Sequence, residues 1–307
     1  MIYDLAIIGG GPAGAAAGVY AARKRLRSVF ITKDWLGQSN VSEKIENWVG
    51  NIAISGLELS NNLEKHVKAY APGIIDIIEG QYCTNVSKSS TGTFTVTTEK
   101  GSYEAKTILI VSGSSRRKLT VPGADIFEHK GLTYCATCDG PLYSDQDVVV
   151  VGGGNAGFES AAQLLAYCKS VTLLSRSEFK ADPGTVEKVL SNPKMKAVQF
   201  TDPKEIKGDK FVSSLIYTES QTQKDTEIAV TGIFAEVGSI PNTGYAKDIV
   251  ALTPFNQVIV DAKNQRTSQD GIWAAGDCTD GLYHQNNIAA GDAVKAIEDI
   301  YLWLNAK

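Results

Sequence analysis

The sequence contains little of what marks secreted, metal-binding or membrane-spanning proteins. Its five cysteines are an odd number, whereas a disulfide-stabilised secreted domain would hold a denser, even set. Its three histidines lie far apart, at positions 66, 129 and 284. No apolar run approaches the ~20 residues of a membrane span. Residues 1–8 also lack the basic start and the long apolar stretch of a secretory signal. We therefore expect a soluble, cytoplasmic protein without a membrane segment or a metal.

The charge balance excludes another group of functions. The net charge is −4 and no basic tract stands out, so neither nucleic acid nor an anionic membrane is an expected partner. With 307 residues, of which 43% are hydrophobic, the chain is long enough for about two domains, each with its own core.

A short apolar strand that runs into a glycine-rich turn occurs twice. Residues 4–14 read DLAIIGGGPAG, and residues 147–157 read DVVVVGGGNAG. The fingerprint glycines recur at the same spacing, as Gly9, Gly11 and Gly14 and again as Gly152, Gly154 and Gly157. An alanine-rich helical segment follows each copy, over residues 15–25 and 158–168. A second apolar strand comes next, over residues 28–32 and 171–174, so the β-α-β unit is repeated.

This repeat predicts two dinucleotide-binding sites. Such glycines permit a tight turn, close approach of the backbone to a pyrophosphate, and close packing of the helix on the sheet. The N-terminus of the following helix offers N–H donors to the phosphates. A single copy would be weak support, but two copies in the same strand-turn-helix context are strong support.

The residues after the second strand of each unit suggest what each site holds. Asp34 follows the first unit, and a carboxylate there can accept hydrogen bonds from a ribose diol. Ser175 and Arg176 follow the second unit, and an arginine there suits a 2′-phosphate. At both positions a simply solvated charge is the alternative.

The remaining patterns predict an α/β protein with two Rossmann-like dinucleotide-binding domains, the second inserted in the first. Further strands are expected over residues 92–98, 107–111, 211–218, 227–236, 257–260 and 271–275, and a last helix over residues 289–304. Gly-, Pro- and Ser-containing segments, 112–123 and 238–244, flank the second repeat and are predicted linkers. The expected domains are residues 1–115 with 240–307, and residues 116–239.

Cys135 and Cys138 form a C-x-x-C pair, directly before Asp139, in the predicted second domain. Structural zinc needs about four ligands, and no second pair of cysteines or histidines is present. A structural disulfide across two residues would constrain little of the unfolded chain. We therefore favour a redox role, in which the pair alternates between dithiol and disulfide. Asp139 is then placed to give or take a proton, although a plain loop aspartate is the alternative.

Two dinucleotide sites and one dithiol together imply an electron relay. Nicotinamide delivers two electrons as a hydride, and a disulfide accepts two electrons. A flavin can carry both between them. The simplest assembly runs from nicotinamide to FAD, to the internal disulfide, and to an external disulfide through a mixed disulfide.

With these features in place, the sequence resembles the low-molecular-weight thioredoxin reductases. The resemblance extends from Tyr3 to about Ala296. The motifs that carry it are Gly9–Gly14, Gly37-Gln38, Glu46-Asn47-Trp48, Cys135-Ala136-Thr137-Cys138-Asp139-Gly140, Gly152–Gly157, and Gly276-Asp277-Cys278 followed by Gln285. The Cys-Ala-Thr-Cys-Asp run is the most specific of them.

The resemblance implies a three-layer ββα architecture, with an FAD-binding first domain and an NAD(P)-binding second domain that carries the C-x-x-C. The residues implied for FAD are Gly9, Gly11, Pro12, Ala13, Gly14, Asp34, Gly37, Gln38, Asn47, Gly276, Asp277, Gln285 and Asn286. Those implied for the nicotinamide coenzyme are Gly152, Gly154, Asn155, Ala156, Gly157, Ser175, Arg176 and Lys180.

The resemblance also implies roles for the catalytic residues. Cys138 would face the flavin, Cys135 would attack the disulfide of a thioredoxin-like partner, and Asp139 would be the general acid. It further implies a homodimer, and domains that rotate so that one dithiol meets the flavin and then the partner.

The chain departs from the family pattern in the coenzyme-selecting segment. The family has a histidine, two arginines and a further arginine, whereas residues 175–182 read SRSEFKAD. Only Arg176 matches, and Lys180 is a substitute for the last arginine. We expect a modest preference for NADPH, with NADH as the alternative. Residues 180–182 and 233–243 also resemble the flavoprotein that reduces peroxiredoxins, which uses NADH.

Two other functions remain open at this point. One is a disulfide reductase of the same fold that takes electrons from another donor, such as ferredoxin. The other is a non-enzymatic, zinc-stabilised nucleotide-binding module. Neither the identity of the protein partner nor the redox state of Cys135 and Cys138 follows from the sequence.

Overall fold

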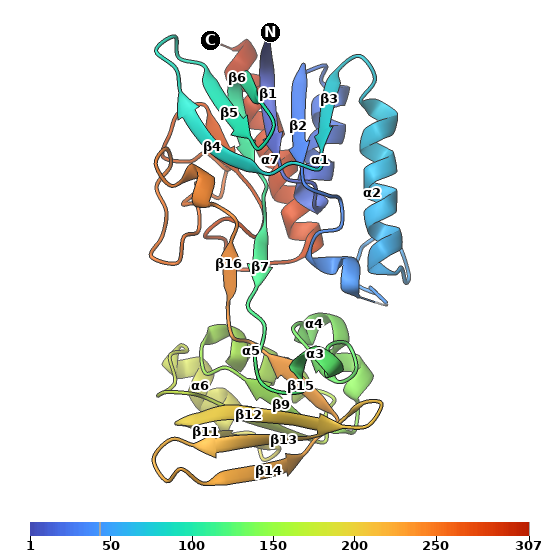
Figure 1. Ribbon diagram of the computed structural model, residues 1–307, viewed down its shortest axis with the longest axis vertical. Helices are drawn as coiled ribbons and strands as arrows, with labels where there is room; N and C mark the ends of the chain where they lie inside the picture. The colour runs from blue at the N-terminus through green and yellow to red at the C-terminus, as the bar shows by residue number, and fades with distance from the viewer. Residues whose placement is uncertain (43, 307) are drawn as a thin grey trace. The chain divides into compact units, whose positions relative to one another are not determined.

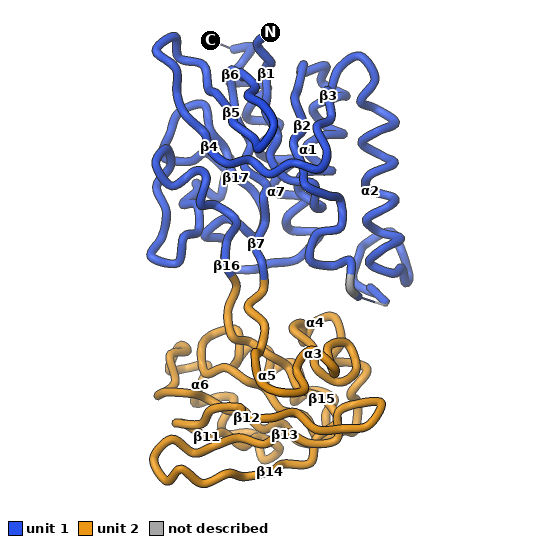
Figure 2. Tube along the Cα trace, viewed as in Figure 1, with its two compact units in different colours: residues 1–115, 240–307 blue, residues 116–239 orange. Residues whose placement is uncertain are grey.

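The computed structural model describes residues 1–42 and 44–306. The chain divides into two compact units. Unit 1 comprises residues 1–115 and 240–307, and unit 2 comprises residues 116–239. Figure 1 labels the helices and strands, and Figure 2 shows the units in different colours. Unit 1 is therefore assembled from both ends of the chain.

Unit 1 contains a seven-stranded sheet in the order β3-β2-β1-β6-β5-β4, with β17 beside β6. The strands are β1 (Ile2–Ile8), β2 (Ser28–Thr32), β3 (Ile75–Glu79), β4 (Cys83–Lys88), β5 (Phe94–Thr98), β6 (Ser102–Ile110) and β17 (Ile272–Ala274). Strands β3, β2, β1, β6 and β17 pair in parallel, whereas β4 and β5 are antiparallel additions. The carboxyl ends of the parallel strands thus meet at one edge, where such sheets bind ligands.

Three helices pack against one face of this sheet: α1 (Pro12–Arg23), α2 (Gly56–Tyr70) and α7 (Asn286–Asn305). Leu5 and Ile7 of β1 point toward them, whereas Ala6 and Ile8 belong to the core on the other face. This alternation follows from the two-residue period of a strand. The short helices η1 (Gln38–Val41) and η3 (Gly244–Ala246) lie in the connections.

The segment after η3 covers the second face of the sheet, and the β4–β5 hairpin at the edge of the sheet contributes to the same core. Val86 and Phe94 of the hairpin and Val258 of the later segment share this core. The strand expected over residues 257–260 is wrong, because only Val258 forms isolated bridges there. A tight turn precedes it, with Asn256 at φ 62° and a hydrogen bond of 2.8 Å from Thr253 N–H to Gln257 O. The chain therefore turns where a longer ladder would have to form.

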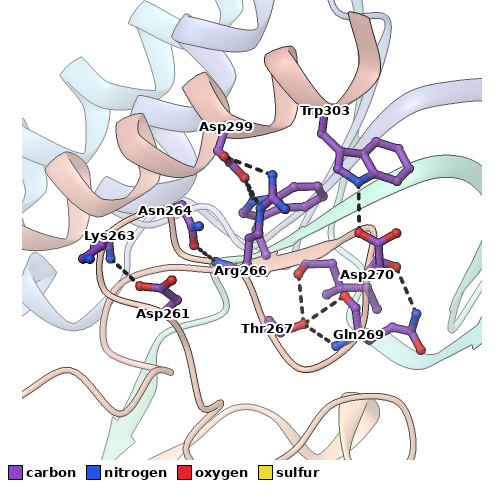
Figure 3. A network of polar contacts seen from close by, with 11 residues as sticks. Asp261, Lys263, Asn264, Arg266, Thr267, Gln269, Asp270, Asp299 and Trp303 are labelled. Carbon is purple, nitrogen blue, oxygen red and sulfur yellow. Dashed lines mark hydrogen bonds and ion pairs between the residues drawn. The ribbon is translucent and has the colours of Figure 1, made fainter. Parts of the chain in front are cut away.

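Helix α7 is fastened to β17 and to the loop before it by a network of polar contacts (Figure 3). Asp299 of the helix accepts hydrogen bonds from Arg266 Nε at 2.6 Å and from Trp273 Nε1 at 2.8 Å. Trp303 Nε1 donates to Asp270 at 2.9 Å. These contacts fix the helix whose first turn reaches the edge of the sheet described above.

Unit 2 contains a five-stranded parallel sheet in the order β11-β10-β9-β15-β8. The strands are β8 (Leu132–Thr133), β9 (Asp147–Val151), β10 (Ser170–Leu174), β11 (Met195–Val198) and β15 (Gly232–Ala235). Strand β9 is almost wholly valine. It lies between β10 and β15, and branched residues suit such a two-sided buried strand.

A second, antiparallel sheet and a helical layer pack on opposite faces of this five-stranded sheet. The second sheet consists of β12 (Thr201–Gly208), β13 (Val212–Glu219) and β14 (Asp225–Ala229). The helices of unit 2 are α3 (Ala124–Phe127), α4 (Ala136–Asp139), η2 (Gly140–Tyr143), α5 (Asn155–Leu164) and α6 (Pro183–Leu190). Val149 packs with Leu215 of the small sheet, and Val150 packs with Phe158 of α5.

The strand expected over residues 227–236 is two strands in different sheets. β14 ends at Ala229 in the small sheet, and β15 begins at Gly232 in the large one. A Cβ at Gly232 would lie 2.6 Å from the Tyr143 ring, so only glycine fits where the second strand enters the core. The segments that join the two units, β7 (Ser114–Arg116) and β16 (Ser239–Pro241), pair as a two-stranded sheet.

Candidate functional site: two glycine loops and a disulfide

The first glycine loop follows β1 at the carboxyl edge of the sheet in unit 1. Gly9 has φ 128°, and a Cβ there would lie 2.2 Å from Val111 O. A Cβ at Gly14 would lie 1.9 Å from Gly9 O, so both positions require glycine. A Cβ at Gly11 would meet nothing within 4 Å. The loop therefore packs tightly on the protein side and is open at the position where the helix begins.

Helix α1 begins at Pro12 with Gly11 as its N-cap, three residues before the expected start. Proline suits the first helical position because its missing N–H has no partner there in any case. Helix α5 begins in the same way at Asn155, with Gly154 as its N-cap. In each unit, the glycine loop thus continues directly into the first turn of the helix.

A cavity of about 770 Å³ opens beside the first loop. All the residues expected to bind FAD line it, except Gly14, Asn47 and Gln285. Gly14 lies beneath the loop, in contact with Gly9. Asn47 and Gln285 are joined to each other by a hydrogen bond of 3.2 Å from Asn47 Nδ2 to Gln285 Oε1. Segments far apart in the sequence therefore build one cavity within unit 1.

The polar side chains of this cavity are held by one another. Gln38 Nε2 donates to both Ser114 Oγ and Asp277 Oδ2, each at 3.1 Å. Asn286 Nδ2 donates to Ser39 Oγ at 2.9 Å. Asn40 differs, because its Oδ1 is buried and has no hydrogen-bond partner among the described residues. An unsatisfied acceptor in a cavity wall indicates a place for a ligand donor.

Asp34 lies at the end of the cavity beyond β2. Its side chain is exposed, and its Oδ1 accepts a hydrogen bond of 3.0 Å from Leu36 N–H. Gly37, in the same segment, has φ 57°, and a Cβ there would lie 3.8 Å from Gly11 Cα. The Asp34 carboxylate is thus oriented by the turn through one of its oxygens.

The second glycine loop repeats the first in unit 2. Gly152 has φ 140°, and a Cβ there would lie 2.2 Å from Glu236 O. A Cβ at Gly157 would lie 1.9 Å from Gly152 O, and one at Gly154 would meet nothing within 4 Å. The open position therefore occurs at the same point of both loops.

The residues expected to select the coenzyme surround this second loop. Ser175 is buried against Gly153, and its hydroxyl donates to Ser177 O at 2.8 Å. Lys180 N–H donates to Gly153 O at 2.8 Å, while its side chain is exposed. Asn155 Oδ1 accepts from Asp182 N–H at 2.9 Å, and Ala156 lies in the first turn of α5. The Ser175 hydroxyl thus packs against the glycine loop and already donates its hydrogen bond within the chain.

Arg176 has a partner that the sequence did not reveal. Its side chain is 82% exposed, and its Nε donates to Asp202 Oδ1 at 2.5 Å. Asp202 lies at the start of β12, 26 residues further on. Part of the positive charge expected to meet a 2′-phosphate is therefore already compensated.

Cys135 and Cys138 form a disulfide, with their Cα atoms 5.3 Å apart. Cys135 is the N-cap of α4, and its Sγ accepts a hydrogen bond of 3.1 Å from Cys138 N–H. Both cysteines and Asp139 are half-buried, which leaves them partly accessible. The structure thus brings the three expected catalytic residues together on one turn.

Thr133 was missed by the sequence patterns, although it lies two positions before Cys135. Its buried hydroxyl donates to Asp139 Oδ2 and accepts a long hydrogen bond of 3.4 Å from Cys135 N–H. Burial, followed by the charge of Asp139, raises the pKa of nearby Tyr143 to about 12. Thr133 thus links the carboxylate to the backbone of the redox turn.

Glu236 was also missed. It directly follows β15 and is half-buried beside the second glycine loop. Desolvation raises the pKa of its carboxyl group to about 7, even though a hydrogen bond from Ser160 opposes the shift. Perturbed groups of this kind gather at functional sites. Only the sequence position, one residue past a buried strand, could have drawn attention to it.

The other three cysteines are free thiols. Burial raises the pKa of Cys168 and Cys278 to about 11 and that of Cys83 to about 12. Because the thiolate is the reactive form, these groups are poor nucleophiles at neutral pH. Across residues 1–42 and 44–306, no cluster of three or more potential metal ligands occurs. In that same part of the chain, every helix is too short or too polar to cross a bilayer.

Residues 3–296 match the family model of the pyridine nucleotide-disulphide oxidoreductases. Among curated proteins, the chain is 36% identical over 296 residues to an NADH dehydrogenase of Bacillus subtilis. It is 37% identical over 297 residues to a subunit of the alkyl hydroperoxide reductase of Pseudomonas putida. These matches cover 96% of the chain but only 57% and 56% of the relatives. The chain thus spans little more than half the length of the curated relatives it matches.

Solved structures of similar length resemble the chain throughout. Thioredoxin reductase from Streptococcus pyogenes has a TM-score of 0.90 and 34% identity, over 100% of this chain and 99% of that one. Thioredoxin reductase from Giardia duodenalis has a TM-score of 0.91 and 29% identity, over 98% of both. These matches confirm the α/β fold with two Rossmann-like units and the resemblance to low-molecular-weight thioredoxin reductases. The chain therefore belongs to the pyridine nucleotide-disulphide oxidoreductase family.

Proposed function

We propose that this chain is a flavoprotein thioredoxin-disulfide reductase. Electrons would pass from NAD(P)H by way of FAD to the Cys135–Cys138 disulfide, and on to the disulfide of a thioredoxin-like protein. The observation that carries the proposal is this disulfide, directly before Asp139, in a chain with two dinucleotide-type glycine loops. The full-length similarity to thioredoxin reductases supports it.

The cavity of unit 1 fits a flavin dinucleotide. Its volume of about 770 Å³ lies in the range of cofactor sites. Gly11 faces open space, so a phosphate can approach the backbone at the start of α1. The unsatisfied Asn40 Oδ1 offers an acceptor to a ligand N–H or O–H group. When bound, FAD supplies two-electron transfer between a nicotinamide and a disulfide.

The cysteines and Asp139 would carry out the exchange with the partner. The Cys135 thiolate attacks one sulfur of the partner's disulfide, and the other partner sulfur leaves as a thiolate. Cys138 then attacks Cys135, which restores the internal disulfide and releases the partner as a dithiol. Asp139 donates a proton to the leaving thiolate. Two electrons leave the internal dithiol and two enter the partner, so the exchange balances.

We propose NADPH as the electron donor, with NADH as the alternative. The exposed Arg176 side chain supports NADPH, because a guanidinium can pair with a 2′-phosphate. Its ion pair with Asp202 argues that the preference is small. The exposed side chain of Lys180 offers a second positive charge.

A second candidate is the reductase of a peroxiredoxin system that uses NADH. The similarity to a subunit of alkyl hydroperoxide reductase supports it, since the chain matches 96% of its own length to that longer protein. The Arg176–Asp202 pair agrees with a donor that lacks a 2′-phosphate. Either function requires the same cysteine pair and the same flavin.

We further propose that the protein works as a homodimer in the cytoplasm. Val49, Ile52 and Ile288 are apolar and exposed, with Ile52 at 96%. They lie on two segments of unit 1 that are joined by a hydrogen bond of 2.7 Å from Asn287 Nδ2 to Asn47 O. Exposed apolar groups of this kind favour a contact between two copies of the chain. Disulfides of cytosolic proteins are usually transient and catalytic, which agrees with the proposed role of this pair.

Anaerobic titration tests the proposal. Purified protein is mixed with NADPH, NADH or reduced ferredoxin, and bleaching of the flavin absorbance is followed before oxidised thioredoxin is added. We expect NADPH to bleach the flavin and thioredoxin to restore the colour. Folded protein that binds no flavin would overturn the proposal, and reduction by ferredoxin alone would replace the nicotinamide donor.

The two cysteines can be separated by trapping. The trap is a thioredoxin that keeps only its first redox cysteine, activated as a mixed disulfide with thionitrobenzoate. Cys135 of the Cys138→Ser variant should attack the thioredoxin sulfur, displace thionitrobenzoate and stay in a stable mixed disulfide, whereas Cys135→Ser should not. Both variants should lose thioredoxin reduction and keep their flavin. Equal trapping by both variants would contradict the assigned roles.

A further inference from the structure

Glu236 occupies the ligand-binding edge of the sheet in unit 2. It follows the last residue of β15, and its N–H donates to Val151 O at 2.8 Å, one step beyond the parallel ladder with β9. Its carbonyl oxygen is the atom that forbids a side chain at Gly152. The residue therefore forms one wall of the second glycine loop.

The side chain of Glu236 is held toward the helix that the same loop opens. Ser160 Oγ, on the second turn of α5, donates to Glu236 Oε1 at 2.6 Å. Ser160 is 8% exposed, so this contact is shielded from water. The carboxyl group thus stands between the end of β15 and the second turn of α5, at the edge where a parallel sheet receives a dinucleotide.

We propose that Glu236 is a positioning residue of the coenzyme site that couples coenzyme binding to the uptake of a proton. The inference rests on the proposed function, since it assumes that the second glycine loop binds a nicotinamide dinucleotide. The pyrophosphate of such a coenzyme carries two negative charges. An ionised carboxylate in the wall of its loop opposes those charges, whereas a protonated carboxyl group does not.

The surroundings keep both forms of Glu236 available near neutral pH. Desolvation is the largest influence and raises the pKa of the carboxyl group to about 7, and the charge of Glu159 on α5 acts in the same direction. The Ser160 hydrogen bond and the positive charge of Arg116, on β7, act in the opposite direction. Glu236 can therefore gain a proton when the coenzyme arrives.

The sign of the effect follows from linkage. If bound coenzyme favours the protonated carboxyl group, then protonation must favour bound coenzyme by the same factor. The dissociation constant should therefore rise as the pH rises through about 7, by about tenfold in all. A role as hydrogen-bond acceptor for a ribose would give the opposite slope.

Calorimetry with the flavin-loaded protein tests this inference. NAD⁺ and NADP⁺ serve as probes, because neither reduces the flavin. Titrations between about pH 6 and about pH 8.5 give the dissociation constant, and buffers of different ionisation enthalpy give the protons taken up. The 2′-phosphate of NADP⁺ titrates near pH 6, so the readout for that probe is the difference between wild type and variant.

Glu236→Gln keeps the shape of the side chain and an acceptor for Ser160. We expect this variant to bind at high pH as wild type does at low pH, without the proton uptake. Glu159→Gln is the matched control: it removes an exposed carboxylate of the same helix and should keep the proton uptake. Wild-type affinity that is flat or improves with pH, or proton uptake that persists in Glu236→Gln, overturns the inference. If neither probe binds at any pH, the proposed function itself fails.

Discussion

The two glycine loops of this protein are nearly the same structure in different surroundings. The first glycine of each has φ 128° or 140°, and its missing Cβ would lie 2.2 Å from a carbonyl oxygen of a neighbouring strand end. The last glycine of each touches the first, and the middle one faces open space. The fingerprint therefore specifies the geometry of the loop, with one open position at the start of the helix, and nothing more.

The differences come from residues outside the fingerprint. The loop of unit 1 faces a cavity with the hydrogen-bonded side chains of Gln38 and Asp277. The loop of unit 2 is walled by Glu236 and lies near the Arg176–Asp202 pair. The comparison teaches that two loops of the same geometry differ in the side chains that distant parts of the chain place around them.

The largest effect is expected from Gly14→Ala and Gly157→Ala. Each added Cβ would lie 1.9 Å from a backbone oxygen, so the loop must distort, at a cost of about 3 kcal/mol. All four tryptophans lie in unit 1. Gly14→Ala should therefore lower the unfolding midpoint seen by tryptophan fluorescence, and Gly157→Ala only the one seen by circular dichroism. Equal shifts in both signals would show that the loops do not report on separate units.

A smaller effect is expected from Glu236→Gln on stability. The pKa of Glu236 is raised from 4.5 to about 7 in the folded protein, so the folded state binds more protons than the unfolded state between these values. Stability should fall as the pH rises across this window and stay lower above it. The variant should be more stable than wild type at pH 8, by on the order of 2 kcal/mol, and equal to it near pH 4. Urea unfolding at both pH values measures this, and an advantage that appears only in acid would contradict it.

Substitution of the open glycines separates binding from folding. Gly11→Ala and Gly154→Ala should leave the unfolding midpoints of the flavin-free protein unchanged, because neither Cβ meets the protein. The new methyl group would instead block the approach of a phosphate. We expect Gly154→Ala to weaken NAD⁺ binding about tenfold without loss of flavin, and Gly11→Ala to weaken flavin retention alone. Calorimetry measures the affinity for NAD⁺, and the flavin content of the purified protein measures flavin retention. Unaltered ligand affinity in both variants would contradict a role of these loops in phosphate binding.

The smallest effect concerns coenzyme choice. Exposed ion pairs are worth about 0.2–1 kcal/mol, so release of Arg176 by Asp202→Asn should raise the preference for NADPH over NADH by a factor of about 1.4 to 5. Arg176→Ala should lower it by a similar factor. The rates of flavin reduction by each coenzyme provide the measurement. If Asp202→Asn changes both rates equally, Asp202 has no part in selection.

What the sequence predicted well depends on near neighbours in the chain. The glycine loops, their strands and the redox turn are each determined by residues within about 20 positions of one another. The hydrophobic pattern therefore predicts their order along the chain. Helix α2 was not predicted, although Ser55 accepts a hydrogen bond from Glu58 N–H, as in a capping box.

Contacts between distant residues could not be inferred in this way. Gln38 and Asp277 are 239 positions apart, and Ser160 and Glu236 are 76 apart. No periodicity or local signal encodes such pairs, because the folded sheets alone bring them together. For the same reason the sequence predicted a role for Arg176 but not its partner, Asp202.

The pairing of β7 with β16 has a consequence for protein engineering. It places the two crossing points, near residues 115 and 240, side by side. A gene that joins these points by a short turn should encode unit 1 as a free-standing protein, and residues 116–239 should be expressible on their own, since the ends of each piece already meet. One of the two units could thus be replaced by another domain while the other unit stays intact.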